Sequence, residues 1–434
     1  MRNPKRCLSV FKQQEKSCFD ITNSIFYPRL IDVFELYDII IIFHNIILIT
    51  ILYSFKNKNH LSKLITEGHM KLTSLVIGDL TARIPIIQGG MGIGISRANL
   101  AAAVANEGGI GIISGVQIGF SEPDFETNPL EANTRALIRE IKHARALSPN
   151  GILGVNFLVA MNNYEQLAKT AVEEGIDIII SGAGLPTRLP EIVQGSKTKI
   201  APMASSGRTA SVICKLWDRK YNRIPDFIVV EGPDAGGHLG YSMEELTLEI
   251  KPNLDQIIKE VFEVIQPYEK KYGKKIPIVA AGGIFTGEDI AKYLRLGASA
   301  VQIATRFIAT EECDAHINFK NAILNAKDGD IKLIKSPVGM PGRALKNNFI
   351  EQLESTPLNI DRCSGCMKAC QAQQAAYCIS EALINAVNGN IDKGLVFSGS
   401  NAHRIDKIVK VKDLMSTLIM EAEEAYSIPF YLIQ

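Results

Sequence analysis

The sequence predicts an α/β protein, a (β/α)8 barrel of the TIM type followed by a small helical C-terminal domain. Two observations support this fold class. Short apolar runs typical of buried strands alternate with longer amphipathic stretches typical of crossover helices. Most of the apolar runs also end in Gly, Ser or Asn, which is typical of barrel strands that open into loops at their carboxyl ends. An open, doubly wound sheet is the alternative if strands at the edges are miscounted.

Eight apolar runs are candidates for the barrel strands, and this number favours a closed barrel. They are residues 84–88, 111–114, 154–158, 177–181, 200–203, 227–230, 276–280 and 300–303. The amphipathic stretches between them are predicted crossover helices. Examples are residues 98–106, 130–146, 164–174, 207–219 and 287–296.

Length and charge indicate one large domain with an appendage and a small-molecule partner. A chain of 434 residues can bury a large core without requiring three domains. Because 47 basic residues stand against 46 acidic ones, no overall field favours nucleic acid or an acidic membrane surface. Eight cysteines without a secretory signal or a small disulfide scaffold predict a reducing, cytoplasmic setting.

Residues 1–69 differ in composition from the rest of the chain, being rich in Ile, Phe, Asn and Lys. Their apolar run at 39–53 spans 15 residues and is interrupted by His44 and Asn45. A bilayer-spanning helix needs about 20 apolar residues, so a membrane partner is not expected unless this run is a real anchor. Our hypothesis is that Met70 is the functional start and that 1–69 is an upstream extension. N-terminal sequencing of the natively expressed protein tests it.

Three further segments follow this extension. Residues 70–310 hold the predicted barrel. After residue 311 the alternation of strands and helices stops, and 311–390 is predicted as a small helical domain with a helical run at 371–387. In the last segment, 391–434, a helix at 411–426 is expected to pack back on the barrel.

One glycine-rich stretch, Glu231-Gly-Pro-Asp-Ala-Gly-Gly-His-Leu-Gly240, follows the sixth predicted strand. Its glycines remove side chains around one imidazole, so that backbone can approach a flat ligand while His238 projects into the space. His238 is therefore the candidate catalytic residue, since imidazole titrates near neutral pH. The alternative is a solvent-exposed histidine in a flexible turn.

Two loops after the seventh and eighth predicted strands indicate a phosphate site. They are Ala280-Ala-Gly-Gly-Ile-Phe285 and Gln302-Ile-Ala-Thr-Arg-Phe307. In barrels these loops commonly bind a phosphate through backbone N–H groups. The sequence has neither a P-loop nor a dinucleotide fingerprint in a strand-turn-helix frame, which favours FMN over a dinucleotide. The alternative for Gly282 and Gly283 is ordinary tight-turn glycine.

Five motifs in order resemble the nitronate monooxygenase family, also called 2-nitropropane dioxygenases, from about Met70 to the C-terminus. They are Ile86-Ile-Gln-Gly-Gly-Met-Gly92, Gly154-Val-Asn-Phe157, Asp234-Ala-Gly-Gly-His238, Ala281-Gly-Gly-Ile284 and Ser336-Pro-Val-Gly-Met-Pro-Gly-Arg343. The same superfamily includes flavin-dependent enoyl-acyl-carrier-protein reductases. The resemblance therefore implies the barrel and FMN more specifically than it implies a substrate.

The resemblance also implies roles for individual positions. The expected flavin contacts are Gln88, Gly89, Gly90 and Met91 at the isoalloxazine, Asn156 as a hydrogen-bond partner, and Gly282, Gly283, Gln302 and Thr305 at the phosphate. Gly237 and His238 would face the substrate. The implied activity is FMN-dependent oxidative denitrification of alkyl nitronates, such as propionate-3-nitronate, by molecular oxygen. The alternative is an NAD(P)H-dependent FMN enoyl-acyl-carrier-protein reductase of fatty-acid synthesis.

Four cysteines cluster late in the chain, as Cys363-x2-Cys366-x3-Cys370-x7-Cys378. Spacings of three and four would place the first three on one helical face, and four thiolates could bind zinc or an iron-sulfur cluster. The pattern is neither a paired zinc ribbon nor a ferredoxin spacing. Reduced thiols are the favoured interpretation, and a metal remains the alternative.

Overall fold

The computed structural model describes residues 71–355, 358, 360 and 363–427, and all of them belong to one compact unit. The predicted extension 1–69, its apolar run and the proposed start at Met70 lie outside the described residues. Among the described helices, none has the length and apolarity needed to cross a membrane. The proposed boundaries at 310 and 390 stay predictions.

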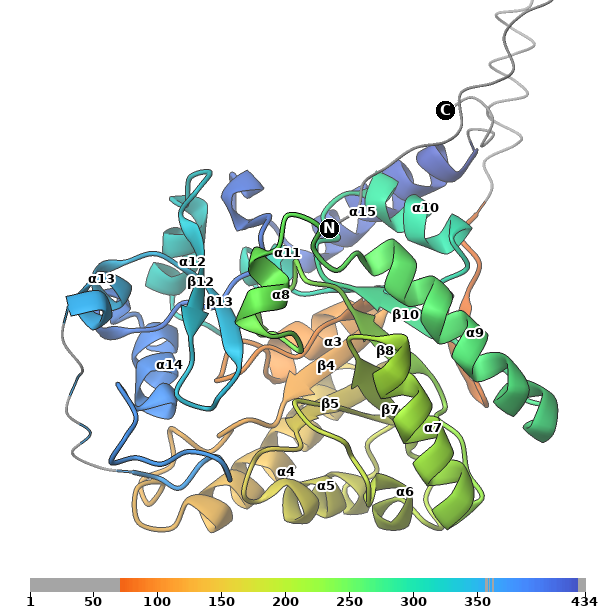
Figure 1. The fold of residues 1–434 in the computed structure, drawn as a ribbon, viewed down its shortest axis with the longest axis horizontal. Helices are drawn as coiled ribbons and strands as arrows, with labels where there is room; N and C mark the ends of the chain where they lie inside the picture. The colour runs from red at the N-terminus through yellow and green to blue at the C-terminus, as the bar shows by residue number, and fades with distance from the viewer. Residues whose placement is uncertain (1–70, 356–357, 359, 361–362, 428–434) are drawn as a thin grey trace, which may run out of the picture. The chain divides into compact units, whose positions relative to one another are not determined.

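Eight parallel strands close into a barrel (Figure 1), in the order β10-β11-β3-β4-β5-β6-β7-β8. This confirms the predicted barrel and excludes the open sheet. Every predicted run overlaps one observed strand, with ends that differ by at most two residues. The strands are β3 (Ile86–Gln88), β4 (Ile110–Ser114), β5 (Ile152–Leu158), β6 (Ile178–Gly182), β7 (Lys199–Ala204), β8 (Ile228–Glu231), β10 (Ile278–Ala281) and β11 (Ala300–Ile303).

Helices surround the barrel, and the five predicted crossover helices are confirmed. They are α3 (Ala98–Asn106), α4 (Pro129–Leu147), α5 (Tyr164–Glu173), α7 (Gly207–Tyr221) and α10 (Gly287–Arg295). Four further helices were not predicted from the sequence: α6 (Leu189–Ile192), α8 (Met243–Thr247), α9 (Leu254–Tyr272) and α11 (Thr305–Ile308). Each long helix buries one apolar face against the strands, as a crossover helix must.

The ring of helices is completed from the end of the chain. After β11 comes only the single turn of α11, and α15 (Val411–Ser427) packs against α10 and α3 instead (Figure 1). The backbones approach closely, because a Cβ at Gly287 would lie 2.3 Å from the backbone nitrogen of Ala422. Glu421 Oε2 also accepts the Gly287 N–H at 2.9 Å.

A short hairpin packs with the inward-facing side chains of the barrel strands. It consists of β1 (Leu75–Ile77) and β2 (Leu80–Ala82), which pair antiparallel. The buried residues Leu75 and Ile77 share one apolar cluster with barrel residues such as Phe227. This hairpin was not predicted from the sequence.

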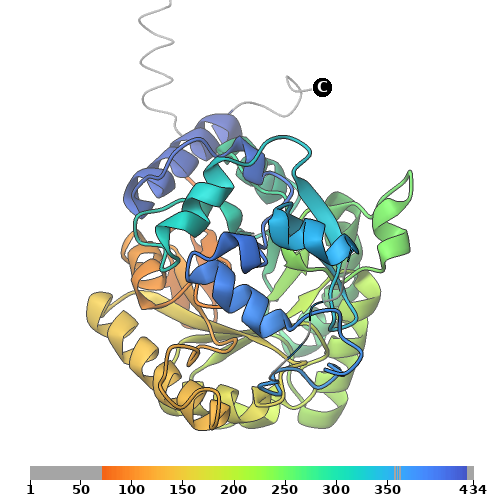
Figure 2. The same ribbon diagram turned by 90° about the vertical axis from the view of Figure 1, so that its left-hand side faces the viewer.

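The remaining elements gather at one end of the barrel, where Figure 2 shows them facing the viewer. They are β9 (Gly237–His238), α12 (Ile317–Leu324), β12 (Ile331–Lys335), β13 (Pro341–Leu345), α13 (Asn348–Ser355) and α14 (Ile379–Val387). β12, β13 and β9 form an antiparallel sheet. Residues 311–390 therefore contain a hairpin as well as helices.

The predicted helix at 371–387 is wrong over its first half. The helix begins only at Ile379, and residues 371–378 form turns. A long-range bond contributes to this difference, since the Leu358 N–H donates to the Ala376 carbonyl at 2.8 Å. Helix propensity depends on neighbouring residues and does not predict such a contact, so the tertiary hydrogen bond overrides it.

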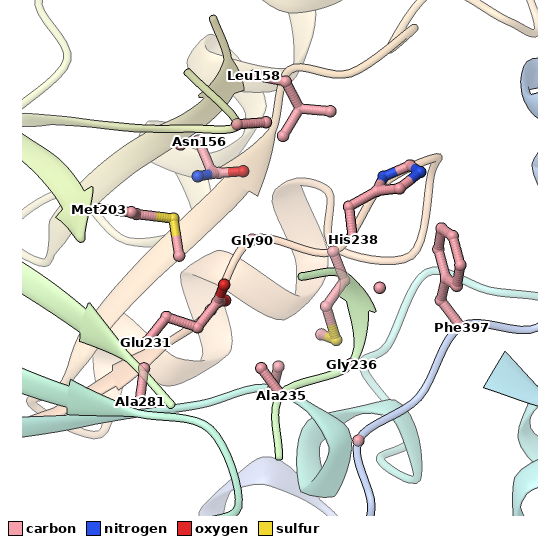
Figure 3. A pocket seen from close by; sticks show the side chains of 18 of the residues that line it. Gly90, Asn156, Leu158, Met203, Glu231, Ala235, Gly236, His238, Ala281 and Phe397 are labelled. Carbon is pink, nitrogen blue, oxygen red and sulfur yellow. The ribbon is translucent and has the colours of Figure 1, made fainter. Parts of the chain in front are cut away.

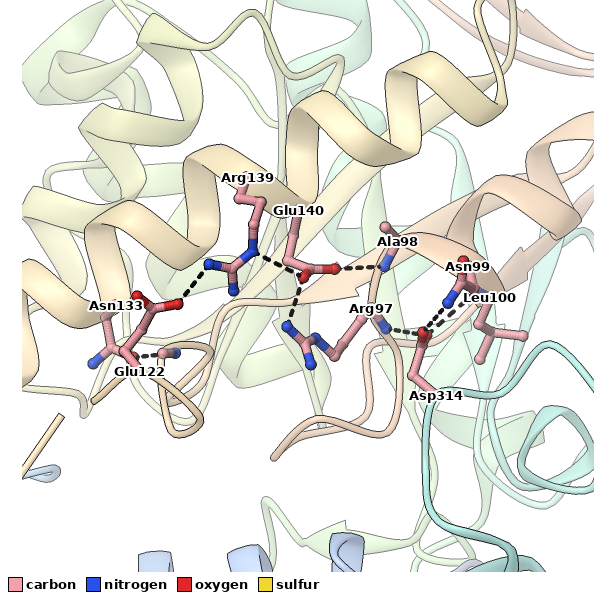
Figure 4. A network of polar contacts seen from close by, with 10 residues as sticks. Arg97, Ala98, Asn99, Leu100, Glu122, Asn133, Arg139, Glu140 and Asp314 are labelled. Carbon is pink, nitrogen blue, oxygen red and sulfur yellow. Dashed lines mark hydrogen bonds and ion pairs between the residues drawn. The ribbon is translucent and has the colours of Figure 1, made fainter. Parts of the chain in front are cut away.

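Two carboxylates stabilise the start of α3, the helix that follows the Gly89–Gly92 loop (Figure 4). Asp314 Oδ2 accepts the Arg97 N–H at 2.8 Å. Glu140, on α4, accepts the Ala98 N–H at 3.1 Å and pairs with the Arg97 guanidinium at 2.6 Å. These bonds satisfy N–H groups that have no partner inside the helix.

Replacing Glu140 by Ala is expected to lower the free energy of unfolding by about 3 kcal/mol, because it leaves the largely buried Arg97 guanidinium unpaired. The control is Lys169→Ala in the exposed pair with Glu173, which should cost at most about 1 kcal/mol. Urea unfolding of both variants measures the difference, provided that the free energy of unfolding depends equally steeply on urea concentration in both. Equal losses would show that the buried pair contributes no more than the surface one.

Candidate functional site

A cavity of about 380 Å³ lies at the carboxyl ends of the barrel strands, within the size range of ligand pockets. It is lined by strand-end loops, by α14, and by a late segment at 397–401. Every residue expected to contact flavin or substrate lines this cavity except Gln88. The described structure thus brings together ten positions that are spread over more than 200 residues of sequence.

The loop after β3 forms a wall without side chains. A Cβ at Gly90 would lie 2.4 Å from the Cβ of Asn156, and one at Gly89 would lie 3.2 Å from the Gln302 side chain. Glycine is therefore needed at Gly90 for this loop to pack against β5. The bare backbone leaves room for a flat ring system, and these contacts fit an isoalloxazine.

Gln88 lies behind this wall instead of in it. Its side chain is fully buried, donates to the Gly89 carbonyl and accepts the Ile112 N–H at 3.1 Å. It therefore holds the glycine loop in place and is not among the residues that line the cavity. The expected direct contact between Gln88 and the isoalloxazine is not supported by this placement.

The two predicted phosphate loops lie side by side, since β10 and β11 are neighbours in the barrel. Gly282 and Gly283 have φ of 92° and 85°, in the left-handed region that favours glycine. A third segment joins them: the Thr305 Oγ1 accepts the Gly399 N–H at 3.0 Å, and the Asn401 Nδ2 donates to the Gly283 carbonyl at 2.7 Å. Sequence reasoning missed this segment, which carries no phosphate motif of its own.

His238 lies on β9, which pairs with β13 opposite Gly342. Its Nε2 is 2.7 Å from the Ser336 Oγ, and its ring packs edge-on against Phe397 with centroids 5.1 Å apart. Burial lowers the pKa of His238 to about 4, so that the imidazole is neutral at pH 7. When Nε2–H donates to Ser336, Nδ1 keeps a free lone pair. A neutral imidazole can accept a proton or donate one hydrogen bond.

Two residues that sequence reasoning missed shape this site. Ser336 directly follows β12. Its place in the Ser336–Arg343 motif was the sequence signal that could have identified it. Glu231 ends β8 and lines the cavity. Figure 3 shows Glu231 extending from the strand end near Ala281, while His238 and Phe397 stand together on another side. Burial raises the pKa of Glu231 to about 8.

The charge of the lining is one-sided. Among the described residues that line the cavity there is no lysine or arginine, and the charged types are Glu231 and Asp234. Arg343 lies outside the lining, where its Nη1 donates to the Pro233 and Ala235 carbonyls. Any anionic group bound here must be stabilised mainly by neutral donors and backbone N–H groups.

Of the clustered cysteines, Cys366 lines the cavity and Cys363 is exposed. Burial raises the pKa of the Cys366, Cys370 and Cys378 thiols. In the described part of the chain, no three His, Cys, Asp or Glu side chains are grouped so as to hold a metal ion. The interpretation of the cluster as reduced thiols stays a prediction.

Comparison with known proteins identifies relatives along most of the chain. A family model described as nitronate monooxygenase matches residues 73–421. A probable nitronate monooxygenase of Staphylococcus saprophyticus is 27% identical over 303 residues, covering 65% of this chain and 81% of that protein. One from Staphylococcus aureus is 28% identical over 309 residues, covering 63% and 78%.

Two solved structures are similar in fold. FabK from Thermotoga maritima has a TM-score of 0.61 and 26% identity, covering 79% of this chain and 93% of that one. Nitroalkane oxidase from Streptomyces ansochromogenes has a TM-score of 0.60, covering 79% and 96%. Its 21% identity supports the fold alone.

Proposed function

The chain belongs to the nitronate monooxygenase family and is a flavin-dependent oxidoreductase, and from this premise we propose that it oxidises alkyl nitronates with molecular oxygen, using FMN. The family resemblance of the sequence motifs is thereby confirmed. The observation that best supports the proposal is the neutral imidazole of His238 facing a cavity walled by glycine and bordered by two loops suited to a phosphate.

We assign the FMN ring to the Gly89–Gly92 wall and the FMN phosphate to the loops that carry Gly282, Gly283 and Thr305. The absence of side chains on the wall and the positive φ of both glycines support this assignment. Asn156 and Gln302, which also line the cavity, would bond the flavin. When bound, FMN accepts the electrons of the substrate and passes them to oxygen.

His238 has a different role for each form of the substrate. Toward a nitronate, which is already an anion, the tautomer whose Nε2 accepts the Ser336 hydroxyl donates its Nδ1–H to a nitro oxygen. Toward a neutral nitroalkane the imidazole removes the α-proton, and its lowered pKa keeps it unprotonated for that task at neutral pH. Ser336 and Phe397 hold the ring in position for both.

The charge of the lining suggests which nitronates are preferred. Propionate-3-nitronate carries a carboxylate in addition to the nitronate, and no lysine or arginine among the described lining residues could pair with it. Burying an unpaired charge is unfavourable by more than about 1.4 kcal/mol, the free energy that corresponds to a tenfold change in the dissociation constant. We therefore expect simple alkyl nitronates such as ethylnitronate to have at least about tenfold higher kcat/KM than propionate-3-nitronate.

The experiment is anaerobic reduction of the purified yellow protein, followed by flavin absorbance. Ethylnitronate is expected to bleach the flavin rapidly and oxygen to restore it, and the chromophore released by heat should be FMN at about one per chain. Bleaching by NADH with reoxidation by an enoyl thioester, and none by nitronates, would instead support the reductase alternative. Released FAD would contradict the cofactor assignment.

A further inference from the structure

The carboxyl group of Glu231 lies in the cavity without a partner in the described part of the chain. The position is fixed by backbone contacts: Glu231 pairs in register with Ala281, and its carbonyl accepts the Tyr241 hydroxyl at 2.6 Å. The side chain itself makes no hydrogen bond or ion pair with any residue that the structure describes. Figure 3 shows it directed into the cavity, below Asn156 and Met203 in that view.

The surroundings of Glu231 disfavour a charged carboxylate. Burial is what shifts the pKa of this carboxyl, since no positive side chain among the described residues acts to stabilise the anion. Asp234 differs, because its charge acts on the neighbouring Arg343 guanidinium. A buried carboxyl without a cation keeps its proton, and a protonated carboxyl is a hydrogen-bond donor.

We propose that Glu231 is a second catalytic residue, a protonated carboxyl that donates a hydrogen bond to a nitro oxygen of the substrate while His238 acts from another side of the cavity. The proposal rests on the proposed function, which supplies the nitro group. It requires the substrate to lie between the two side chains, and both of them line the same cavity.

The chemistry gives such a donor a specific task. When a neutral nitroalkane reacts, its α-C–H bond breaks, the proton goes to the imidazole of His238, and the electron pair moves onto the nitro oxygens. Glu231 keeps its own proton and shares it in a hydrogen bond with the oxygen that becomes negative. A neutral carboxylic acid in an apolar site can stabilise a developing oxyanion in this way.

Other titratable groups line the cavity or, like Tyr241, contact Glu231 from outside the lining, and their titration must be separated from that of Glu231. His238 has a pKa of about 4 and does not change charge between pH 6 and pH 10. Burial raises the pKa of the Tyr241 phenol and of the Cys366 thiol, the latter in the lining contributed by the C-terminal region. Asp234 is the other carboxyl of the lining, and its conversion to Asn is the matched control.

The test uses the FMN-loaded protein and propionate, a carboxylate that resembles ethylnitronate in shape and stays an anion from pH 6 to pH 10. Its dissociation constant is measured from the change in flavin absorbance. In the parent protein the constant should rise above about pH 8, approaching tenfold per pH unit, because the ionised Glu231 no longer donates and repels the ligand.

The variants give a distinct pattern. Glu231→Gln should bind propionate at neutral pH and lose the pH dependence, since an amide donates but cannot ionise. Glu231→Ala should bind at least about tenfold more weakly at every pH, the effect of losing a hydrogen bond to a charged group. Asp234→Asn should keep the rise above pH 8.

Two outcomes overturn the inference: a parent dissociation constant that does not change with pH, or a Glu231→Gln protein that retains the change. The proposed function is tested separately by anaerobic reduction of the parent with ethylnitronate at pH 7. Failure of that reduction rejects nitronate oxidation and with it the catalytic role of Glu231. Successful reduction with an unchanged pH profile in Glu231→Gln rejects only the role of Glu231.

Discussion

Replacing His238 by Ala is expected to leave FMN bound and to lower kcat/KM for a neutral nitroalkane by about 100- to 10,000-fold, the contribution of a general base. FMN should remain because its proposed contacts come from other loops. With a preformed nitronate no proton has to be removed, so the loss should reflect one missing hydrogen bond, about tenfold. Stopped-flow reduction of the flavin by both forms of nitroethane measures the two losses.

The pH profile supplies a second readout for His238. Because burial lowers its pKa to about 4, the base stays unprotonated as the pH falls, and kcat/KM of the parent for nitroethane should decline only near pH 4. An exposed histidine would lose activity near pH 6.5. The control is His143→Ala, on the outer face of α4, which should match the parent. Equal losses for nitroalkane and nitronate would contradict the role of base.

Replacing Gly90 by Ala is expected to remove FMN while the barrel stays folded. The new Cβ would lie 2.4 Å from the Asn156 Cβ, so one of the two segments must move, and both contribute to the proposed flavin wall. Overpacking of this kind costs about 1–3 kcal/mol, which corresponds to about 5- to 150-fold in affinity. Flavin content and the dissociation constant for added FMN provide the measurement.

Gly89→Ala is the matched control, because its Cβ would be 3.2 Å from the flexible Gln302 side chain, which can shift. We expect a smaller loss of FMN affinity than in Gly90→Ala. Circular dichroism should show the same helix content for both variants. If Gly90→Ala binds FMN as tightly as Gly89→Ala, the ring does not rest on this wall.

Local sequence alone determined the barrel strands, because apolar runs with abrupt glycine-rich ends depend on neighbours in the chain. It also located the phosphate loops, since these follow directly from the position of the seventh and eighth strands. The stretch around His238 was recognised for the same reason, as its glycines are adjacent in sequence. The assignment of these residues to FMN and substrate stays a prediction.

Only the tertiary structure decided which groups surround His238 and Glu231. The Ser336 hydroxyl is 98 positions from His238 in sequence and reaches it through the pairing of β13 with β9. The isolation of the Glu231 carboxyl, and with it the shifted pKa, depends on burial by segments far apart in the chain. Gln88 likewise lies behind the glycine wall, where its amide oxygen accepts the buried Ile112 N–H of the neighbouring strand. Burial and long-range pairing are properties of the assembled fold, which no local pattern encodes.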